Sequence, residues 1–485
     1  MISPVFKTRR NAQRWRFLYP LILSSAIFLF ACSNLMMPEP AELGIPIPAT
    51  YTLYEETAPA PDRWWESFGS DEINKLVQDA ITSSQTLKVL LARLQQSEAL
   101  AVQAGADKLP DLNLRAGASE TTRSTGSQTL RDSSRSLTLV SNWEIDFWGR
   151  VRAEHRTALL EVEISREDLY AATLTLSAET TLNWLEIIAV RRQLALFREQ
   201  LETNRTILEL IELRYMKGLA NVLDIYQQRQ VVAELEAGFP QLEAQLQTLY
   251  HSIAVLSGKP PRTDMGITAD SFPEFPAQPE TGVPADLLSK RPDVRAAGLN
   301  LRAAENQVAA ARAGRLPSVN LSATGGVSSD NLVDLVENWL ATLAANLTMP
   351  IFNAGSSKAA VTRQEKIVEE RLASYGQIVL AAMGEVEDAM VRENSQTSYI
   401  EGLRHQLTIS RDGFREAVSR YRKGLSDYLP VLSALTSTQR LERSIVQEEF
   451  ERFSQRVKLH RALGGTWMSQ EFEKKNAEHR TQNAE

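Results

Sequence analysis

Reactive side chains are scarce in this chain of 485 residues. It contains one cysteine, Cys32, so no disulfide can form within the chain and cysteine pairing says nothing about the redox compartment. The five histidines are scattered, and none lies in an HExxH or similar zinc-binding spacing. Gly258-Lys259 lacks the rest of a phosphate-binding loop, and no GxSxG motif occurs. These absences predict a protein that is not an enzyme and that holds neither a metal nor a cofactor.

An excess of basic residues is also missing. The net charge is −7 at pH 7 and the isoelectric point is near 5.6. A nucleic-acid interface needs a concentrated basic face, and no such cluster occurs outside the N-terminus. We therefore expect no nucleic-acid partner. With 43% hydrophobic and 23% charged residues, the composition is that of an ordinary folded protein that can support a core.

The single cysteine follows a segment typical of secretory signals. A basic stretch over residues 7–16 leads into an apolar run over residues 17–31, which is too short for a confident membrane span. The run ends in Leu29-Phe30-Ala31-Cys32, which resembles a bacterial lipobox, where the cysteine is lipidated and becomes the first residue of the mature chain. We therefore predict a lipoprotein signal peptide over residues 1–31 and an acylated, palmitate-bearing Cys32. An uncleaved signal anchor with a buried cysteine is the alternative.

Two segments lack the periodicity of helices and strands. Residues 32–62 are rich in proline and alanine, which predicts an extended tether between the lipid anchor and the fold. Ser33 after the cysteine indicates, by the same resemblance, sorting to the outer membrane. Residues 466–485 are predicted to form a polar tail without fixed structure.

Two similar segments divide the rest of the chain into long repeats. They are RYMKGLANVLDI at residues 214–225 and RYRKGLSDYLPVL at residues 420–432, which begin 206 residues apart (420 − 214). In each, basic residues and a glycine end one apolar-periodic stretch before another begins, as at the turn between two helices. We therefore predict helical-hairpin tips at about residues 214–222 and 420–428. Asn221 and Ser426-Asp427 are expected to cap the returning helices.

The two repeats are predicted to span residues 63–257 and 285–465. They are separated by residues 258–284, a linker that contains six prolines. Each repeat is expected to begin with a helix, at about residues 72–107 and 285–314, that ends before a Leu-Pro pair.

Long helices are the main feature of both repeats. Neither proline nor glycine occurs from Arg150 to Met216, which predicts one helix roughly 90 to 100 Å long. The returning helix carries apolar residues spaced by three and four from Val232 to Leu256, which is typical of a coiled-coil seam. Pro240 is expected to bend or locally open this helix. A second long helix is predicted from about Ser356.

Four segments show the alternation of strands. They are residues 110–118, 136–147, 317–325 and 338–351, which we expect to form two hairpins closed by polar loops. Their length suits membrane-spanning β-strands. Because four strands cannot close a barrel and open edges are not tolerated in lipid, several chains would have to share one barrel. Two soluble hairpins on a small core are the alternative.

Three tryptophans lie close to the expected ends of these strands. Trp143, Trp148 and Trp339 suit an aromatic girdle at the membrane boundaries. Packing at the junction between strand and helix is the alternative, and for Trp148 it is the preferred one.

Taken together, the motifs resemble the TolC-type outer-membrane factor family, and within it the lipoprotein branch that serves resistance-nodulation-division (RND) efflux systems. The resemblance covers nearly all of the mature chain. Its motifs are Trp64-Trp65 with Phe68, WEIDFWGR at residues 143–150, Arg291-Pro292-Asp293-Val294, AAARAGRLPSV at residues 309–319, Pro350-Ile351-Phe352 with Gly355, and the two tips. Each motif is weak alone, and their order across both repeats is specific.

The resemblance implies a mainly α-helical fold with a membrane β part. A homotrimer would form an α-helical periplasmic barrel, continued by one outer-membrane β-barrel to which each protomer lends four of twelve strands. It would be a passive conduit in the outer membrane of a Gram-negative bacterium, exporting drugs, toxic compounds or metal ions as part of a tripartite efflux system. A periplasmic adaptor (membrane fusion) protein and an inner-membrane RND pump would be its partners.

Two other functions stay open from the sequence. The same fold could serve an ABC-type (type I) protein secretion system, or the chain could be a surface coiled-coil protein without a pore. The sequence does not name the transported substrate.

The resemblance also implies roles for residues at the tips. Gly218, Leu219, Gly424 and Leu425 would form the docking surface for the adaptor. The candidates for a gate at the tunnel mouth are Arg420, Tyr421, Asp427, Tyr428, Leu432 and Asp224. Many relatives have an aspartate where this chain has Ser433, so the constriction is expected to depend on Leu432 or Asp427.

Overall fold

The computed structural model describes residues 41, 43–52, 63–126, 128–279, 281–330, 335, 338–465 and 467–468. Cys32, the signal segment and most of the polar tail lie outside these residues. The chain divides into two compact units, which are described separately. One falls within Met1–Ile45, Arg93–Arg166 and Ala296–Gln377, and the other within Pro46–Ala92, Glu167–Arg295 and Ile378–Glu485.

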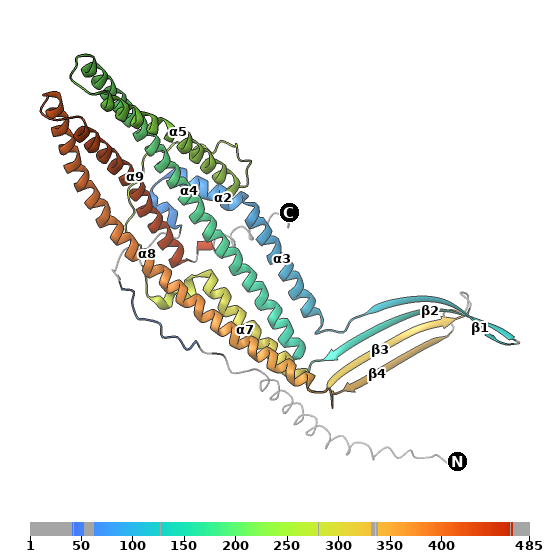
Figure 1. Ribbon diagram of the computed structural model, residues 1–485. Helices are drawn as coiled ribbons and strands as arrows, with labels where there is room; N and C mark the ends of the chain where they lie inside the picture. Colours follow the sequence, from blue (N-terminus) through green and yellow to red (C-terminus); the bar gives the residue numbers. More distant parts are fainter. Residues whose placement is uncertain are drawn as a thin grey trace, which may run out of the picture. The chain divides into compact units, whose positions relative to one another are not determined.

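The two halves of the chain contain the same order of elements (Figure 1). The first half contains η1 (Trp64–Phe68), α2 (Asp71–Ser83), α3 (Gln85–Ala106), β1 (Asn113–Thr125), β2 (Gln128–Ile145), α4 (Arg150–Met216) and α5 (Val222–Leu256). The second contains η2 (Pro284–Asp286), α6 (Leu287–Lys290), α7 (Pro292–Ala313), β3 (Ser318–Ser329), β4 (Trp339–Thr348), α8 (Ser356–Arg422) and α9 (Leu429–Leu463). Helices α4 and α8 both have 67 residues, and α5 and α9 both have 35.

The four strands form one antiparallel sheet in the order β1-β2-β3-β4. Strands β1 and β2 are longer than predicted, because the Ser/Thr-rich segment expected to be a loop is paired as far as Thr125 opposite Gln128. This segment is exposed on both faces, so its side chains do not alternate between apolar and polar, although threonine itself favours strands. Strand β4 ends at Thr348, earlier than predicted, ahead of Pro350, which has no N–H to donate to a sheet.

The pairing register places almost all the apolar strand residues on one side of the sheet. Opposite residues in an antiparallel pair point to the same side, so the register fixes which side chains are neighbours. We call this side the apolar face: Leu114 and Ala116 of β1; Leu137, Leu139, Trp143 and Ile145 of β2; Val319, Leu321, Ala323 and Val327 of β3; and Trp339, Ala341, Leu343, Ala345 and Leu347 of β4. The other side carries mainly Arg, Asn, Asp, Glu, Ser and Thr, with Leu130, Val140, Leu340 and Ala344 as exceptions.

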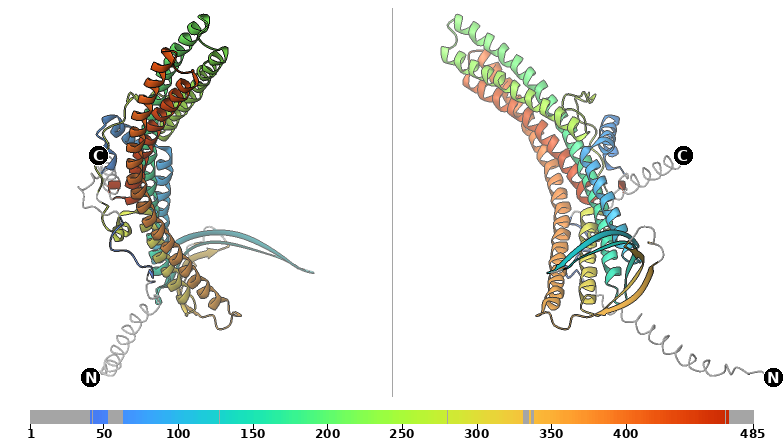
Figure 2. Two further views of the ribbon diagram at one scale, coloured as in Figure 1. Left: turned by 60° about the vertical axis from the view of Figure 1, so that its left-hand side comes forward. Right: turned by 90° about the vertical axis from the view of Figure 1, so that its right-hand side faces the viewer.

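Helical hairpins form most of the second unit. Helices α4 and α5 are joined by one tip and α8 and α9 by the other, and both turns lie at the same end of the bundle (Figures 1 and 2). Helix α4 begins at Arg150 and ends at Met216, as predicted. Helix α5 runs from Val222 to Leu256 and continues through Pro240.

The chain between the repeats is irregular but firmly held. Residues 258–279 and 281–283 contain neither helix nor strand, as their prolines predict. Arg456 of α9 is 2% exposed, and its guanidinium donates to the carboxylate of Glu393 and to the carbonyls of Pro276 and Ala277. It also lies over the ring of Phe275, with 4.6 Å to the centroid. One buried cation therefore ties the linker to α8 and α9.

Two predicted boundaries differ from the structure. The first helix is broken at Ser84, whose ψ of 128° is not helical, which fits the weak helix preference of serine. Trp467 and Met468, placed by the sequence in the polar tail, are buried. Trp467 packs edge-on against Trp65 with 4.8 Å between ring centroids, so the fold extends at least to Met468.

Replacing Arg456 with alanine should lower the free energy of unfolding by about 3 to 5 kcal/mol, because it leaves the buried carboxylate of Glu393 without its partner. Thermal unfolding of the purified protein in detergent would measure the change. Arg392 is a matched control, since its bond to Asp388 joins two exposed side chains and its loss should cost less than about 1 kcal/mol. Equal effects of the two substitutions would contradict a fastening role for Arg456.

Candidate functional site

The apolar face is the first candidate functional surface. Leu343 is 81% exposed and Leu347 is 72% exposed, and the face extends over all four strands. The shortest strand has 10 residues, which is enough to cross the hydrocarbon of a bilayer when tilted. Within the residues that the structure describes, no helix has the length and apolarity of a membrane span. The sheet thus has the dimensions and the surface for contact with lipid.

The edges of the sheet limit how it can be used. Among the described residues, β1 and β4 each pair on one side only. In a bilayer each unpaired backbone group costs several kcal/mol, because no water is present to satisfy it. A sheet with this face can therefore lie in lipid only if further strands pair with both edges.

The junctions between strands and helices are built by the WEIDFWGR motif. The carboxylate of Asp146 accepts the backbone N–H groups of Val151 and Arg152, at 3.2 and 2.9 Å, and so caps the start of α4. The indole N–H of Trp143 donates to the carbonyl of Lys108, and that of Trp148 to the carbonyl of Pro317. Both tryptophans thus connect segments near the ends of strands, while Trp339, at the other end of the apolar face, is 76% exposed.

The first tip is a tight turn after α4. Gly218 adopts a φ of 72°, which glycine tolerates without strain, and the N–H of Leu219 donates to the carbonyl of Arg214 at 2.9 Å. Asn221 caps α5 as predicted, and the carboxylate of Asp224 accepts the N–H of Asn221 in return. Asp224 is therefore engaged in the turn itself.

The second tip repeats this geometry except at its cap. Gly424 also has a φ of 72°, and the N–H of Leu425 donates to the carbonyl of Arg420 at 2.9 Å. The prediction that Ser426-Asp427 caps the next helix is wrong, because the N-cap residue is Tyr428 and it makes no side-chain capping bond. The Tyr428 side chain is instead completely buried beneath the turn.

Five buried residues from both hairpins pack together behind the turns, and we call them the tip cluster: Ile211, Ile225, Tyr421, Tyr428 and Val431. The two tyrosine rings are tilted, with centroids 5.7 Å apart. Burial raises the pKa of both Tyr421 and Tyr428, and for Tyr421 it outweighs the nearby Arg214 cation, which acts to lower the pKa, so both phenols stay neutral at physiological pH. The cluster therefore holds the two tips together without charge.

A chain of buried hydrogen bonds extends from the tip cluster along the helices. The Tyr428 hydroxyl donates to Oε1 of Gln228, and Nε2 of Gln228 donates to the carbonyl and Oδ1 of Asn204, at 2.7 and 3.0 Å. Asn204 donates to Oε1 of Gln439 at 3.1 Å, and Gln200 donates to the Gln439 carbonyl at 3.1 Å. All five side chains are at most 5% exposed. We call them the polar ladder, and it joins α4, α5 and the start of α9.

The family model for outer membrane efflux proteins matches residues 76–259 and 283–465. The chain belongs to this family. The pyoverdine export outer membrane protein OpmQ of Pseudomonas aeruginosa is 32% identical over 468 residues, which cover 92% of this chain and 97% of OpmQ. The outer membrane protein OprJ of the same organism is 28% identical over 420 residues, covering 83% and 86%.

Solved structures of outer membrane channels have the same fold. The channel OprN matches with a TM-score of 0.83 and 26% identity, covering 89% of this chain and all of OprN. VceC of Vibrio cholerae matches with a TM-score of 0.78 and 27% identity, covering 84% of this chain and all of VceC. The predicted TolC-type fold and the predicted function as an outer membrane efflux channel are confirmed. This outer membrane efflux protein is a channel protein of a family with no indicated catalytic activity.

The candidate gate residues of this efflux protein fall into two groups. Tyr421 and Tyr428 are inside the tip cluster, and Leu432 packs against its edge. Arg420 and Asp427 are exposed. The tyrosines can therefore act by holding the two hairpins together, whereas only the exposed charges are free to meet another surface.

The roles of two residues at the tips are not evident from the two similar segments: Arg214, which begins the first segment, and Gln228, which lies beyond it. The guanidinium of Arg214 lies over the Tyr421 ring, 4.4 Å from its centroid, and connects the first tip to the second. Gln228 occupies a seam position, since Ile225, Gln228 and Val232 are spaced by three and four. A polar residue on an otherwise apolar seam is the signal that predicts a buried hydrogen bond.

A groove of about 1040 Å³ lies between the two tips. Leu219 and Leu425 line it and are 63% and 66% exposed, and Val222 and Leu223 add further exposed apolar surface. The apex leucines predicted for docking thus lie together at one groove. Within the described ranges, no three His, Cys, Asp or Glu side chains come together as metal ligands.

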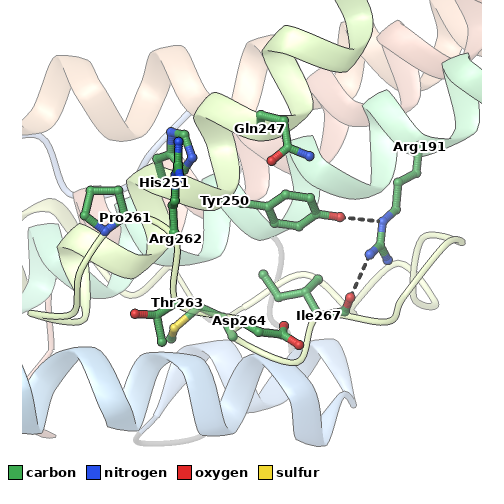
Figure 3. Close-up of a pocket in the computed structure, with 10 residues that line it drawn as sticks. Arg191, Gln247, Tyr250, His251, Pro261, Arg262, Thr263, Asp264 and Ile267 are labelled. Carbon is green, nitrogen blue, oxygen red and sulfur yellow. Dashed lines mark hydrogen bonds between the residues drawn. The ribbon is translucent and has the colours of Figure 1, made fainter.

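A second cavity, of about 480 Å³, lies beside the inter-repeat linker (Figure 3). Arg191 of α4 donates to the hydroxyl of Tyr250 at 3.0 Å and to the carbonyls of Ile267 and Ala269, both at 2.7 Å. Figure 3 shows this side chain reaching across from α4 toward α5 and the linker. Arg191 therefore fastens the linker at this cavity, as Arg456 does elsewhere.

A charge on the apolar face should destabilise the protein in a bilayer, whereas the same charge on the other side should do so far less. Leu343→Arg places a guanidinium near the middle of β4 and should cost about 2 to 4 kcal/mol of folding free energy in a bilayer. Thr342→Arg, one residue away on the opposite side, is the matched control. Urea titration of the protein folded into vesicles would measure both, and equal losses would contradict lipid contact by this face.

The Tyr428 hydroxyl should contribute more to the free energy of unfolding than the Tyr421 hydroxyl. Tyr428→Phe leaves the buried amide oxygen of Gln228 without its donor, which should lower the free energy of unfolding by about 1 to 3 kcal/mol. Tyr421→Phe should change it by less than about 0.5 kcal/mol, because the buried Tyr421 hydroxyl has no hydrogen-bond partner among the described residues. Thermal unfolding in detergent would compare the two, and the reverse order would refute the role of the polar ladder.

Proposed function

We propose that three copies of this efflux protein form one continuous duct, with a shared β-barrel in the outer membrane and an α-helical tunnel in the periplasm. The observation that carries this proposal is the pair of open edges on a sheet with an apolar face. Strand β4 of one protomer would pair with β1 of the next, which closes a barrel and removes every edge. Acylation of Cys32 would add a lipid anchor to each protomer.

We infer that the duct is passive and does not choose its cargo. Relatives of similar sequence are named for different cargoes, including pyoverdine for OpmQ and toluene for TtgF of Pseudomonas putida, which is 26% identical over 468 residues. A lumen that serves such different molecules contacts them loosely. Selection and energy would then come from an inner-membrane RND pump, and the cargo of this chain would be a small molecule.

The tips would be the docking surface for a periplasmic adaptor. Leu219 and Leu425 are exposed at the groove, and the two glycine turns hold both leucines at the apex. Exposed apolar residues grouped on one surface are typical of protein interaction sites. Residues Arg420 and Asp427, which are exposed near the same apex, would contribute to the gate, with Leu432 or Asp427 as the constriction.

A photoreactive residue in place of Leu425 would test the docking assignment in native cell envelopes. The expected product is a cross-link to a periplasmic adaptor that co-purifies an RND pump, identified by mass spectrometry. An adaptor bound to an ABC transporter would instead support a protein secretion channel. The absence of any periplasmic product, together with the absence of discrete conductance in planar bilayers, would favour a surface protein without a pore.

Gly424→Val should weaken adaptor coupling while the channel still reaches the membrane. Valine is strained at a φ of 72° by about 1 to 3 kcal/mol, so the turn and Leu425 should shift, although no atom blocks the new side chain. The yield of the adaptor cross-link and the efflux of cargo from cells should both fall several-fold. Gly413→Val, in the helical part of α8 and also open to solvent, should change neither, and an unchanged cross-link in Gly424→Val would argue against docking at the tips.

A further inference from the structure

The hairpin of β1 and β2 continues beyond the rest of the sheet. Strand β2 pairs with β3 only from Arg135 to Ile145, whereas β1 and β2 stay paired as far as Thr125 and Gln128. Residues 118–125 and 128–135 form a two-stranded ribbon, roughly 25 Å long. Its first row, Ala118 and Arg135, still borders Ser329 of β3, and its other rows extend past β3 and β4 (Figure 1). We call this part of the hairpin the ribbon.

Two arginines follow the apolar face directly onto the ribbon. The register gives a last apolar row of Trp339, Val327, Leu137 and Ala116. The next residue on this side of β2 is Arg135, and Arg131 lies on the same side four residues further along. The positive charge thus begins where the surface suited to hydrocarbon ends.

The other groups on this side of the ribbon suit an anion. Thr122, Ser124, Thr129 and Ser133 lie on the same side as the arginines and provide hydroxyl donors. Glu120, opposite Ser133, is also there and sits diagonally between Arg131 and Arg135, so two positive charges face one negative charge. Arg123 and Asp132 lie on the opposite side. The ribbon therefore has a cationic side, continuous with the apolar face, and a second side without excess charge.

At the boundary between the hydrocarbon and the headgroups of a membrane, phosphate is the group that an arginine side chain can bind. An arginine at the edge of the hydrocarbon extends its guanidinium to the headgroup layer, where its paired N–H groups match the oxygens of a phosphate. Every strand of the sheet connects to its helix at the end away from the hairpin turns. With the helices in the periplasm, as in the proposed function on which this inference rests, the ribbon faces the outer leaflet.

We propose that Arg131 and Arg135 bind phosphate groups of lipid headgroups in the outer leaflet of the outer membrane. The protein would thereby gather a layer of phosphate-bearing lipid around the ribbon. Arg135 also donates to the backbone carbonyl of Asp330, which holds its side chain near the turn between β3 and β4.

The test uses the full-length protein in phosphatidylcholine vesicles that contain a trace of spin-labelled phosphatidic acid, whose headgroup is a phosphate monoester. The fraction of label immobilised at the protein surface gives the preference for this lipid over labelled phosphatidylcholine. Arg131→Gln should lower the preference about five-fold, and the double variant Arg131→Gln with Arg135→Gln should lower it further. Arg131→Gln leaves the bond from Arg135 to Asp330 in place.

Arg123→Gln is the matched control, because it removes the same charge from the other side of the same ribbon. The expected result is an unchanged preference in this variant, and a spin-labelled fatty acid, whose headgroup is a carboxylate, should be bound less well than phosphatidic acid by the wild type. Equal losses in Arg123→Gln and Arg131→Gln would overturn the proposal, as would an unchanged preference in the double variant. If the protein forms channels in planar bilayers but shows no preference for phosphatidic acid, only this inference is refuted. If the protein fails to insert into bilayers, the proposed function is refuted.

Discussion

A protein backbone in lipid must have every N–H and C=O group paired, and this constraint decides how the chain can be used. The sheet has an apolar face on which Leu343 is 81% exposed, and two edges without partners among the described residues. The described strands of one chain would leave these edges unpaired in lipid, which is the physical ground for the proposed assembly of three copies. The junctions must then hold each strand to its helix within one protomer, which is what the Asp146 cap on α4 and the bond from Trp148 to Pro317 do.

Long helical hairpins have a different requirement, which is a fixed register. A seam built only from leucine and valine packs almost equally well after a shift of one heptad, whereas a buried amide fits only where its partners lie. Gln228 and Asn204 are 0% exposed, and the amide N–H of Gln228 on α5 donates to the carbonyl and the side-chain oxygen of Asn204 on α4. Burying these amides unpaired would cost stability, so the polar ladder favours one alignment over the others. Through Tyr428 the same alignment extends to the start of α9.

Patterns that depend on neighbouring residues were predictable, and features that depend on distant packing were not. The bounds of α4 follow from the absence of proline and glycine between Arg150 and Met216. The sequence predicts a loop where the ribbon lies, because residues 119–134 are mostly polar and do not alternate with apolar ones. The cap of α9 was misplaced because burial of Tyr428 against the first hairpin decides where that helix begins. Likewise, only the contact of Trp467 with Trp65, from the other end of the chain, shows that the core continues past residue 465.

The position of each candidate gate residue limits the force by which it can keep the tips closed. The hydrogen bond from Tyr428 to Gln228 lies within one protomer and is fully buried, so salt hardly weakens it, whereas Arg214, which stacks on Tyr421, is half-buried. Arg420 and Asp427 are exposed, and any attraction they make to another surface is screened within about 10 Å at ordinary ionic strength. Since Ser433 contributes no charge, an interprotomer closure built on Asp427 would be weak and sensitive to salt, whereas the alignment of the two hairpins would persist. The interprotomer closure and the alignment of the hairpins can therefore be separated by experiment, because only the interprotomer closure should weaken as the salt concentration is raised.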